Sequence, residues 1–473
     1  MTKHRIKIAE KDLKKIEELV FVDHPKEAGA FALAGVAKRE DGFDIIVRRP
    51  IEIPKNLFSV QHEFRFEISS KAINGLIALC EKNGLTAILC HSHPENIPYS
   101  TSDDYGEKRI FEILLQFLPQ KMPMASMLFY PGGIRSRIWL PDASKPVSIS
   151  EVIVTGRYVR SIQSYPSLKY KSEFYKDIFD RQIRAFGKEG QSYIFRTKIG
   201  IVGLGSTGSA CAEQIVRLGV RDIVIIDPDK FEPSNITRMY GSFNNEEKTW
   251  RPFKGKKPKK VDIISAHLKK INPNIKIQAI PKTVVLNEAA TKLIDRDIIF
   301  LCTDDHWGRS IVNQIAYQYF IPTINVGMRI SANKKDGKIS EANGAIDVLR
   351  PDLPCLWCRQ YLRSDRIATE SMPRSARQSR EREGYVEDIQ THAPSVISIT
   401  TALSGLAVTL FLQLVTDFLG PNGDIARLTY FIMDGEMRRG RATILNECVC
   451  QKVRAFGDLR SLNTLKDISF LDG

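Results

Sequence analysis

The segment KIGIVGLGSTGSACAEQIVRLG, residues 198–219, constrains the fold more than any other part of the chain. It opens with an apolar run typical of a buried strand and passes through Gly203, Gly205 and Gly208 into a helical pattern. Glycines let a backbone approach a chain of phosphates, and the N-terminus of the following helix offers N–H groups to it. The next strand-like run leads to Asp227, which is placed to hold a ribose hydroxyl. Taken alone, the segment predicts a nucleotide-binding βαβ unit, typical of a nicotinamide or flavin enzyme.

The same alternation of strand and helix continues along the second half of the chain. Strand patterns occupy Lys198–Val202, Asp222–Ile226, Ile275–Ala279 and Asp297–Cys302, and helix patterns occupy Gly208–Leu218 and Val261–Ile271. Such a series predicts an α/β fold with a Rossmann-like, doubly wound and mostly parallel sheet covered by helices.

Charged residues beside these strand ends favour ATP over a dinucleotide. A hydride-transfer site needs no lysine and arginine around the phosphates, whereas a triphosphate needs cations, and its Mg²⁺ needs a carboxylate. The segments DPDKFEPSNITR and CTDD, with a lysine before a helix and an upstream arginine, supply these groups. The candidates are Asp227, Asp229, Asn235, Arg238, Lys260, Asp304, Arg309 and Arg181.

These motifs resemble the ThiF/MoeB/ubiquitin-activating superfamily of adenylating enzymes over roughly residues 179–450. The matching segments, in family order, are RQI, GxGxxG, DxDxxExSNxxR, KVDIISAHLKKINP, CTDD and APSVIS. The resemblance implies binding of ATP with Mg²⁺ and adenylation of the C-terminal glycine of a ubiquitin-like protein. It implies that Asp227 holds the ribose and that Asp304 takes the Mg²⁺ role. It further implies that the phosphates are contacted by Asn235, Arg238 and Lys260, with Lys259 left open as the alternative lysine.

Two features bear on the assembly and on the fate of the adenylate. Arg181 is similar to the arginine that often reaches the nucleotide from the partner subunit, so a homodimer is expected. Ubiquitin-activating enzymes carry a thioester cysteine in a loop after the nucleotide site, but the segment RIATESMPRSAR has none, and Ile367 occupies its expected position. We expect the adenylate to pass directly to an external nucleophile, as on a conjugating-enzyme-like protein, in preference to another cysteine of this chain.

Four of the eight cysteines form two close pairs, PCLWC and ECVC. Four thiolates in this arrangement suit a structural zinc ion, and the superfamily often carries one held by two CxxC pairs. The second pair here is CxC, a departure from that pattern, and four reduced cysteines are the alternative. The predicted ligands are Cys355, Cys358, Cys448 and Cys450. This cysteine usage does not suit a disulfide framework and indicates a reducing, cytoplasmic setting.

Residues 1–150 predict a separate small α/β unit, followed by a linker at 151–170 and the adenylation unit at 171–473. Predicted helices are Glu10–Leu19, Ser70–Lys82 and Asp103–Phe117. Predicted strands are Ala30–Val36, Phe43–Ile51, Thr86–Cys90, Ala125–Tyr130 and Ser136–Leu140.

The segment CHSHPENIPYSTSDD follows one of these strands and carries a candidate metal site. His91 and His93 are two residues apart on an extended segment, so they face the same side. Two imidazoles with a nearby carboxylate make a three-ligand zinc site with a position open for water.

This segment resembles the JAB/MPN/JAMM metalloprotease family, whose signature is a distant glutamate, then HxHP, a spacer and SxxD. The resemblance covers roughly residues 10–140 and implies a peptidase or isopeptidase acting after the terminal glycine of ubiquitin-like proteins. It implies that Glu27 is the general base on the zinc-bound water and then the proton donor. Ser100 would help to hold the tetrahedral oxyanion. Asp103 is favoured as the third ligand because that frame keeps the serine, and Asp104 is the alternative.

Charge and hydropathy leave few other functions open. The net charge of +14 lies partly in KGKKPKK and RSARQSRER, which are read as solvated loops, so nucleic acid is not the favoured partner. The apolar segment Val396–Val415 is long enough to cross a bilayer, but its six hydroxyl and amide side chains favour a buried core or interface helix. No membrane association is expected.

The combined prediction is a bifunctional enzyme of a ubiquitin-like protein pathway. One unit would trim or remove the ubiquitin-like protein, and the other would adenylate the glycine that trimming exposes. Similar fusions occur in prokaryotic ubiquitin-like pathways, some of them linked to antiviral defence. This setting is implied by the resemblance alone. The alternatives are a sulfur-carrier adenylyltransferase of the thiamin, molybdopterin or cysteine type and a non-catalytic scaffold that binds nucleotide or nucleic acid.

Overall fold

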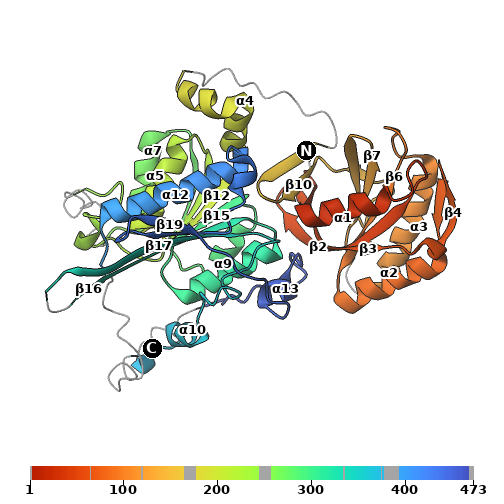
Figure 1. The fold of residues 1–473 in the computed structure, drawn as a ribbon. Helices are drawn as coiled ribbons and strands as arrows, with labels where there is room; N and C mark the ends of the chain where they lie inside the picture. The colour runs from red at the N-terminus through yellow and green to blue at the C-terminus, as the bar shows by residue number, and fades with distance from the viewer. Residues whose placement is uncertain are drawn as a thin grey trace. The chain divides into compact units, whose positions relative to one another are not determined.

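The structure, a computed structural model, describes residues 3–63, 65–118, 121–163, 177–243, 257–333, 336–373, 375–377 and 394–467. The chain divides into two compact units (Figure 1). Unit 1 contains Met1–Tyr170, Gln318–Phe320 and Val453–Ser461. Unit 2 contains Lys171–Tyr317, Ile321–Lys452 and Leu462–Gly473. Two short segments from late in the chain therefore belong to the first unit.

Unit 1 is built on a nine-stranded mixed sheet in the order β11-β10-β1-β3-β2-β6-β7-β8-β9. Its strands are β1 (Arg5–Ala9), β2 (Gly29–Arg39), β3 (Gly42–Glu52), β6 (Thr86–Ser92), β7 (Met124–Tyr130), β8 (Gly133–Trp139), β9 (Val147–Ser148), β10 (Glu151–Thr155) and β11 (Val159–Gln163). A separate hairpin joins β4 (Phe58–His62) to β5 (Arg65–Ile68). The helices are α1 (Glu10–Val20), α2 (Ser70–Asn83) and α3 (Thr101–Phe117).

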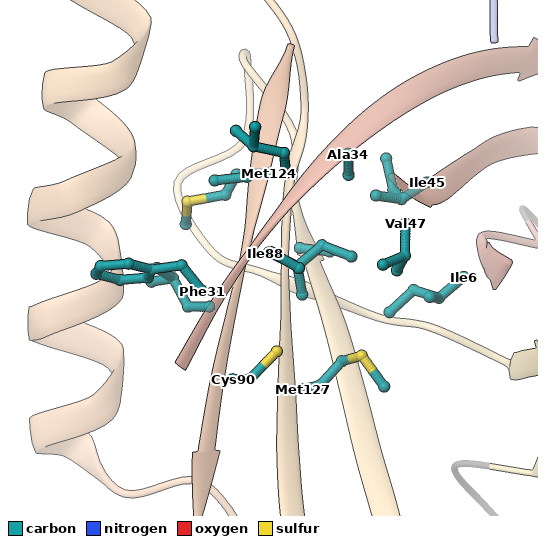
Figure 2. Close-up of a cluster of buried hydrophobic side chains, with 14 of the residues drawn as sticks. Ile6, Phe31, Ala34, Ile45, Val47, Ile88, Cys90, Met124 and Met127 are labelled. Carbon is teal, nitrogen blue, oxygen red and sulfur yellow. The ribbon is translucent and has the colours of Figure 1, made fainter. Parts of the chain in front are cut away.

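The core of unit 1 follows from the apolar pattern of these elements. Leu13, Ile16 and Val20 are spaced along one face of α1, and all three are buried. The central strand β6 is buried along its whole length, as expected for a strand paired on both sides and covered on both faces. Figure 2 shows neighbouring strands contributing to one cluster, with Ile6, Phe31, Ala34, Ile45, Val47, Ile88, Cys90, Met124 and Met127 labelled.

Several strands of unit 1 were not predicted from the sequence, for identifiable reasons. β1 contains Arg5 and Lys7, whose charges are buried against Asp44 at 2.8 and 3.1 Å, so the segment looked like a charged N-terminus. The linker predicted at 151–170 is wrong for residues 151–163, which form β10 and β11. β10 pairs in parallel with β1 through an alternating segment, EVIVT, that is too short to give a clear strand signal.

Unit 2 is built on an eight-stranded sheet in the order β14-β13-β12-β15-β16-β17-β18-β19. Its strands are β12 (Lys198–Val202), β13 (Asp222–Ile226), β14 (Lys276–Ile280), β15 (Ile298–Leu301), β16 (Thr323–Ala332), β17 (Ile339–Leu349), β18 (Arg427–Phe431) and β19 (Glu436–Arg439). Its helices are α4 (Asp180–Arg196), α5 (Ser206–Arg217), α7 (Lys260–Ile271), α8 (Asn287–Ala290), α9 (His306–Gln318), α10 (Ser364–Glu370), α12 (Ile397–Thr416) and α13 (Val449–Val453).

The Rossmann-like part of unit 2 is confirmed, but the sheet is mixed. β14, β13, β12, β15 and β16 are parallel, whereas β16, β17, β18 and β19 pair in antiparallel fashion. Helices α5 and α7 pack on one face of this sheet and α9 on the opposite face (Figure 1). The α/β architecture is therefore doubly wound through the parallel strands and extended by an antiparallel edge.

Among the described residues, α12 is the one helix long and apolar enough to cross a membrane by length and composition. It packs along α5 and β16, and Leu403, Ala407 and Phe411 join the buried core of unit 2. The ring centroid of Phe411 lies 6.0 Å from that of Phe300 on β15. These contacts agree with the buried core or interface helix that the sequence favoured.

Candidate functional sites

The glycine loop of unit 2 joins β12 to α5. Gly203 has φ 87°, and a Cβ there would lie 2.6 Å from the backbone nitrogen of Thr303. A Cβ on Gly208 would lie 1.8 Å from the carbonyl oxygen of Gly203. A Cβ on Gly205 would meet no atom within 4 Å. Packing therefore requires the first and third glycines, whereas the second faces open space at the N-terminus of α5, where phosphates could approach.

The carboxyl ends of three parallel strands bring the predicted nucleotide residues to one edge of the sheet. Val202 is in register with Ile226 on β13 and with Leu301 on β15, so the residues that follow these strands lie near the glycine loop. Asp227 is buried, and its carboxylate accepts hydrogen bonds from the backbone N–H groups of Leu204 at 2.6 Å and Asp229 at 2.8 Å. Burial raises the pKa of Asp227, while the Lys260 charge acts in the opposite direction.

Lys260, not Lys259, faces this edge. The Lys260 ammonium is 2.6 Å from Asp229 Oδ2, and its side chain is 9% exposed at the first residue of α7. Lys259 is exposed and contributes a backbone bridge to Lys230. The ion pair holds Lys260 in place and gives its charge a partner that an incoming phosphate would have to replace.

Asp304 and Asp305, which follow β15, have different surroundings. Asp305 accepts hydrogen bonds from the Thr303 hydroxyl and the Gly308 N–H, so it is occupied at the start of α9. Asp304 is exposed, as a ligand for a solvated cation should be.

Two further candidate residues follow β13. Asn235 is buried, and its side-chain oxygen accepts a hydrogen bond from the Glu232 N–H at 3.1 Å. Arg238 follows it and is half-buried.

The structure does not bring Arg181 to the glycine loop of its own chain. Arg181 is exposed in the first turn of α4, and the next residue, Gln182, donates to the carbonyl oxygen of Arg217 at 3.3 Å. Arg217 ends α5, whereas the glycine loop begins it. The 12 residues of α5 separate these ends by about 18 Å.

One residue beside Asp304 gave no signal in the sequence. Glu370, at the end of α10, accepts hydrogen bonds from the backbone N–H groups of His306 at 3.0 Å and Trp307 at 2.7 Å. Its carboxylate thus satisfies the first turn of α9. Because this contact joins residues far apart in the chain, no local pattern could predict it. Ile367, at the position expected for a thioester cysteine, lies in the same helix.

The four predicted zinc cysteines lie together. Sγ–Sγ distances are 3.7 Å for Cys355–Cys358, 3.5 Å for Cys355–Cys448 and 3.8 Å for Cys358–Cys450. A tetrahedral site with Zn–S bonds of about 2.3 Å separates its sulfurs by about 3.8 Å. Burial raises the pKa of Cys448 to about 12, so its thiolate would form near neutral pH only with a cation beside it. The donor set and its spacing fit zinc.

Replacing Cys358 by serine is expected to remove one zinc per chain and to lower the melting temperature by roughly 5–10 °C, about 2–4 kcal/mol. The reason is that the site fixes the loop of Cys355 to the segment of Cys448. Zinc analysis and thermal unfolding measure both effects. Cys211→Ala, at a buried cysteine of α5, should keep the zinc. Full zinc content in the Cys358→Ser protein would contradict the assignment.

The second candidate metal site lies in unit 1 at the end of β6. The Ser92 hydroxyl turns inward and donates to the Val20 carbonyl oxygen at 2.6 Å, so the histidines on either side face the other way. His91 Nε2 is 3.4 Å from Asp103 Oδ1, and His93 Nε2 is 3.7 Å from Asp103 Oδ2. One ligand atom from each of these three residues lies within 4.8 Å of the others.

The histidine rings are poised as ligands. His93 Nδ1 is 3.1 Å from the Ile97 carbonyl oxygen, which fixes the ring and leaves Nε2 for the cluster. His91 Nε2 is buried and has no hydrogen-bond partner among the described residues. Burial lowers the pKa of His91 to about 4 against the opposing charge of Asp103, so the ring is neutral at physiological pH. An orphaned, neutral imidazole nitrogen beside a carboxylate fits a divalent metal.

The structure brings Asp103, and not Asp104, to the histidines. Asp104 turns away, 54% exposed, and accepts a hydrogen bond from Arg137. Asp103 Oδ2 accepts from the N–H of Ser100 at 2.6 Å and from its hydroxyl at 2.8 Å, while the Asp103 N–H donates to that hydroxyl. Ser100 thus caps α3 and orients Asp103, and an oxyanion role would require its hydroxyl to leave Asp103.

Glu27 lies at the edge of this cluster, just before β2. Its Oε1 is 3.5 Å from His93 Nε2, and the side chain is 8% exposed. Burial, and then the charge of Asp103, raise the pKa of Glu27 to about 7. A carboxyl group with this pKa can take up and release a proton near neutral pH.

Comparison with known proteins bears on the second half of the chain. Residues 179–450 match the model of the ThiF family. The chain is 22% identical to the SAMP-activating enzyme E1 of Haloferax volcanii over 172 residues, covering 36% of this chain and 56% of that protein. It is 24% identical to the molybdopterin-synthase adenylyltransferase of Escherichia coli over 193 residues, covering 40% and 70%. A crystal structure of E. coli MccB with ATP covers 60% of this chain and 76% of its own, at 14% identity and a TM-score of 0.44.

Proposed function

The chain belongs to the ThiF family, and from this premise we propose that unit 2 adenylates the C-terminal glycine of a ubiquitin-like or sulfur-carrier protein with ATP. The observation that carries the proposal is the meeting of the glycine loop, Asp227, Lys260 and Asp304 at the carboxyl ends of adjacent parallel strands. The names of the relatives, enzymes that activate such carriers, support this substrate class.

The chemistry asks this chain mainly for positioning and charge. A carboxylate oxygen of the tail attacks the α-phosphorus, and pyrophosphate leaves. Asp227 would hold the ribose, and Lys260, Arg238 and Asn235 would contact the phosphates. Asp304 would hold Mg²⁺, which supplies charge neutralisation on the phosphates when it is bound. Before ATP binds, the ion pair with Asp229 balances the charge of Lys260. On binding, Lys260 would exchange this partner for a phosphate.

The place of Arg181 supports a homodimer. Because it lies at the end of α5 remote from its own glycine loop, an action on the phosphates requires that it come from a second copy of the chain. This proposal agrees with the role that the family resemblance implies for this arginine.

We further propose that unit 1 is a zinc-dependent peptidase or isopeptidase acting on the same tail. The cluster of His91, His93 and Asp103, with the orphaned His91 Nε2, supports a metal site. Zinc, when bound, would polarise the carbonyl that is cleaved. Glu27, 3.5 Å from His93, would take a proton from the attacking water and pass it to the leaving amine.

The fate of the adenylate separates this reading from sulfur transfer. The segment RIATESMPRSAR has no cysteine, which suits direct transfer to an external nucleophile and also suits a sulfur-carrier pathway. Mass spectrometry of a carrier incubated with the protein and ATP tests both. An AMP adduct is expected first. Conversion to a thiocarboxylate by a sulfur donor would favour the sulfur-carrier reading, and a lysine-linked product would favour conjugation.

The glycine loop allows a sharp test of nucleotide approach. Gly208→Ala forces a Cβ against the Gly203 carbonyl oxygen, so we expect a loss of about 1–3 kcal/mol in the free energy of unfolding. Gly205 has φ −69° and open space beside it, so Gly205→Ala should keep its stability within about 1 kcal/mol but weaken ATP binding. Thermal unfolding and calorimetric ATP titration measure the two effects. Unchanged ATP affinity in Gly205→Ala would contradict close phosphate approach.

A further inference from the structure

The side chain of Arg137 joins strand β8 to the start of α3, next to the candidate metal ligand Asp103. Arg137 is buried, with a side chain 8% exposed. Its Nε donates to Glu107 Oε2 at 2.9 Å, and its Nη1 donates to Asp104. Both acceptors lie on α3, one immediately after Asp103 and one a turn later. One guanidinium therefore fixes the rotation and the height of the turn that carries Asp103.

The same guanidinium supports the histidine side of the cluster. Its central carbon lies 3.7 Å from the centre of the Tyr99 ring. The Tyr99 ring in turn packs edge-on against His91, with ring centroids 5.8 Å apart and planes at 64°. Tyr99 also directly precedes Ser100, the N-cap of α3. Arg137 thus touches the residues on both sides of the capping box that orients Asp103.

We infer that Arg137 is a positioning residue of the metal site, holding Asp103 and His91 in the geometry that ligates the ion. This inference rests on the proposed function of unit 1. It also gives the two adjacent aspartates of this segment different roles. Asp103 is the ligand, and Asp104 holds helix α3 through its hydrogen bond with Arg137. Asp103 Oδ1 lies 3.4 Å from His91 Nε2 and Asp103 Oδ2 lies 3.7 Å from His93 Nε2, so a shift of the first turn of α3 would change both distances.

Lysine cannot replace arginine here. Its single ammonium can reach Glu107 or Asp104, but it lacks the planar fork that serves both and the flat face that covers Tyr99. Arg137→Lys therefore keeps the charge beside the buried Glu107, which protects the fold, and loses the geometry. Arg137→Ala is unsuitable alone, because it would leave the buried Glu107 carboxylate without its ion-pair partner, although the Trp139 indole N–H would still donate to it.

The test measures zinc affinity in the full-length protein by chelator competition. Arg137→Lys is expected to weaken the affinity of this site by about 10- to 100-fold, with an unchanged melting temperature when both proteins are compared without metal in this site. Cobalt substitution should show an altered visible spectrum, which a merely stabilising role would not produce. Glu112→Gln, which breaks an exposed ion pair with Lys108 on the same helix, should bind zinc like the wild type. Affinity of Arg137→Lys within twofold of the wild type would overturn the inference.

Three further variants separate this inference from the proposed function. The double variant His91→Ala/His93→Ala should hold one zinc fewer than the wild type, since the four-cysteine site remains; equal zinc content would instead overturn the metal site itself. Asp103→Asn should lose this zinc, and Asp104→Asn should keep it with weakened affinity. The reverse pattern would make Asp104 the ligand and overturn the role of Arg137 as its anchor.

Discussion

Replacing Asp304 by alanine is expected to lower ATP–pyrophosphate exchange by about 100- to 1,000-fold. Asp304 is the exposed carboxylate at the end of β15, beside the glycine loop, and it is the proposed holder of Mg²⁺. Without it the cation would lose its fixed place on the triphosphate, and the charge on the leaving pyrophosphate would be compensated by Lys260 and Arg238 alone. Exchange of labelled pyrophosphate into ATP, in the presence of the carrier, measures the effect.

The neighbouring Asp305 provides a matched control. Its carboxylate is engaged by Thr303 and Gly308 at the start of α9, so Asp305→Ala should cost about 1 kcal/mol of stability and leave most of the exchange activity. Thermal unfolding of both variants separates folding from chemistry. Equal losses of activity in the two variants, or near-normal exchange by Asp304→Ala, would show that Asp304 has no special role.

Replacing Glu27 by glutamine is expected to lower cleavage of a ubiquitin-like fusion by about 100- to 10,000-fold while the zinc of unit 1 is retained. Glutamine keeps the shape of the side chain but cannot accept the proton of the attacking water. Glu27 Oε1 is 3.5 Å from His93 Nε2, so the group is close enough to act on water at the site. Glu27 is not one of the three clustered candidate ligands, so metal binding should survive its replacement. Cleavage is followed by gel or mass spectrometry, and zinc by elemental analysis.

Glu95 lies exposed in the loop after His93, and Glu95→Gln is the corresponding control, expected to cleave at the wild-type rate. Cleavage that survives in Glu27→Gln would refute Glu27 as the base. Loss of the zinc in that variant would instead make Glu27 a ligand. Absence of cleavage by the wild type with every tail tested would contradict the peptidase proposal for unit 1.

The elements nearest the candidate nucleotide site could be predicted well from the sequence, because their signals are local. The glycines between β12 and α5 indicate a sharp turn. The apolar runs of β12, β13 and β15 are short and bounded by polar residues, which indicates buried strands. Parallel strands then bring Asp227 and Asp304 to the same edge without further information. The choice between neighbours, such as Lys259 and Lys260, needed the structure, since only burial and the contact with Asp229 distinguish them.

Contacts between distant residues could not be predicted. The bond from Glu370 to the start of α9, the anchoring of α3 by Arg137 and the pairing of β10 with β1 all join segments that no periodic pattern connects. The strand β1 was not predicted for the same reason. Its buried Lys7 is stabilised by an ion pair with Asp44, and the sequence does not show that Asp44 lies beside it. Physical chemistry determines which residue types suit a site, and the tertiary structure determines which residues of each type lie in it.

The most direct test of adenylation is ATP–pyrophosphate exchange with candidate carriers whose tails end in glycine. Exchange is expected with at least one ubiquitin-like or sulfur-carrier protein, to depend on Mg²⁺, and to disappear when the terminal glycine is deleted. The Asp304→Ala protein should show little of it. Exchange that proceeds without any carrier tail, or no exchange and no AMP adduct with any carrier, would contradict the proposed function of unit 2.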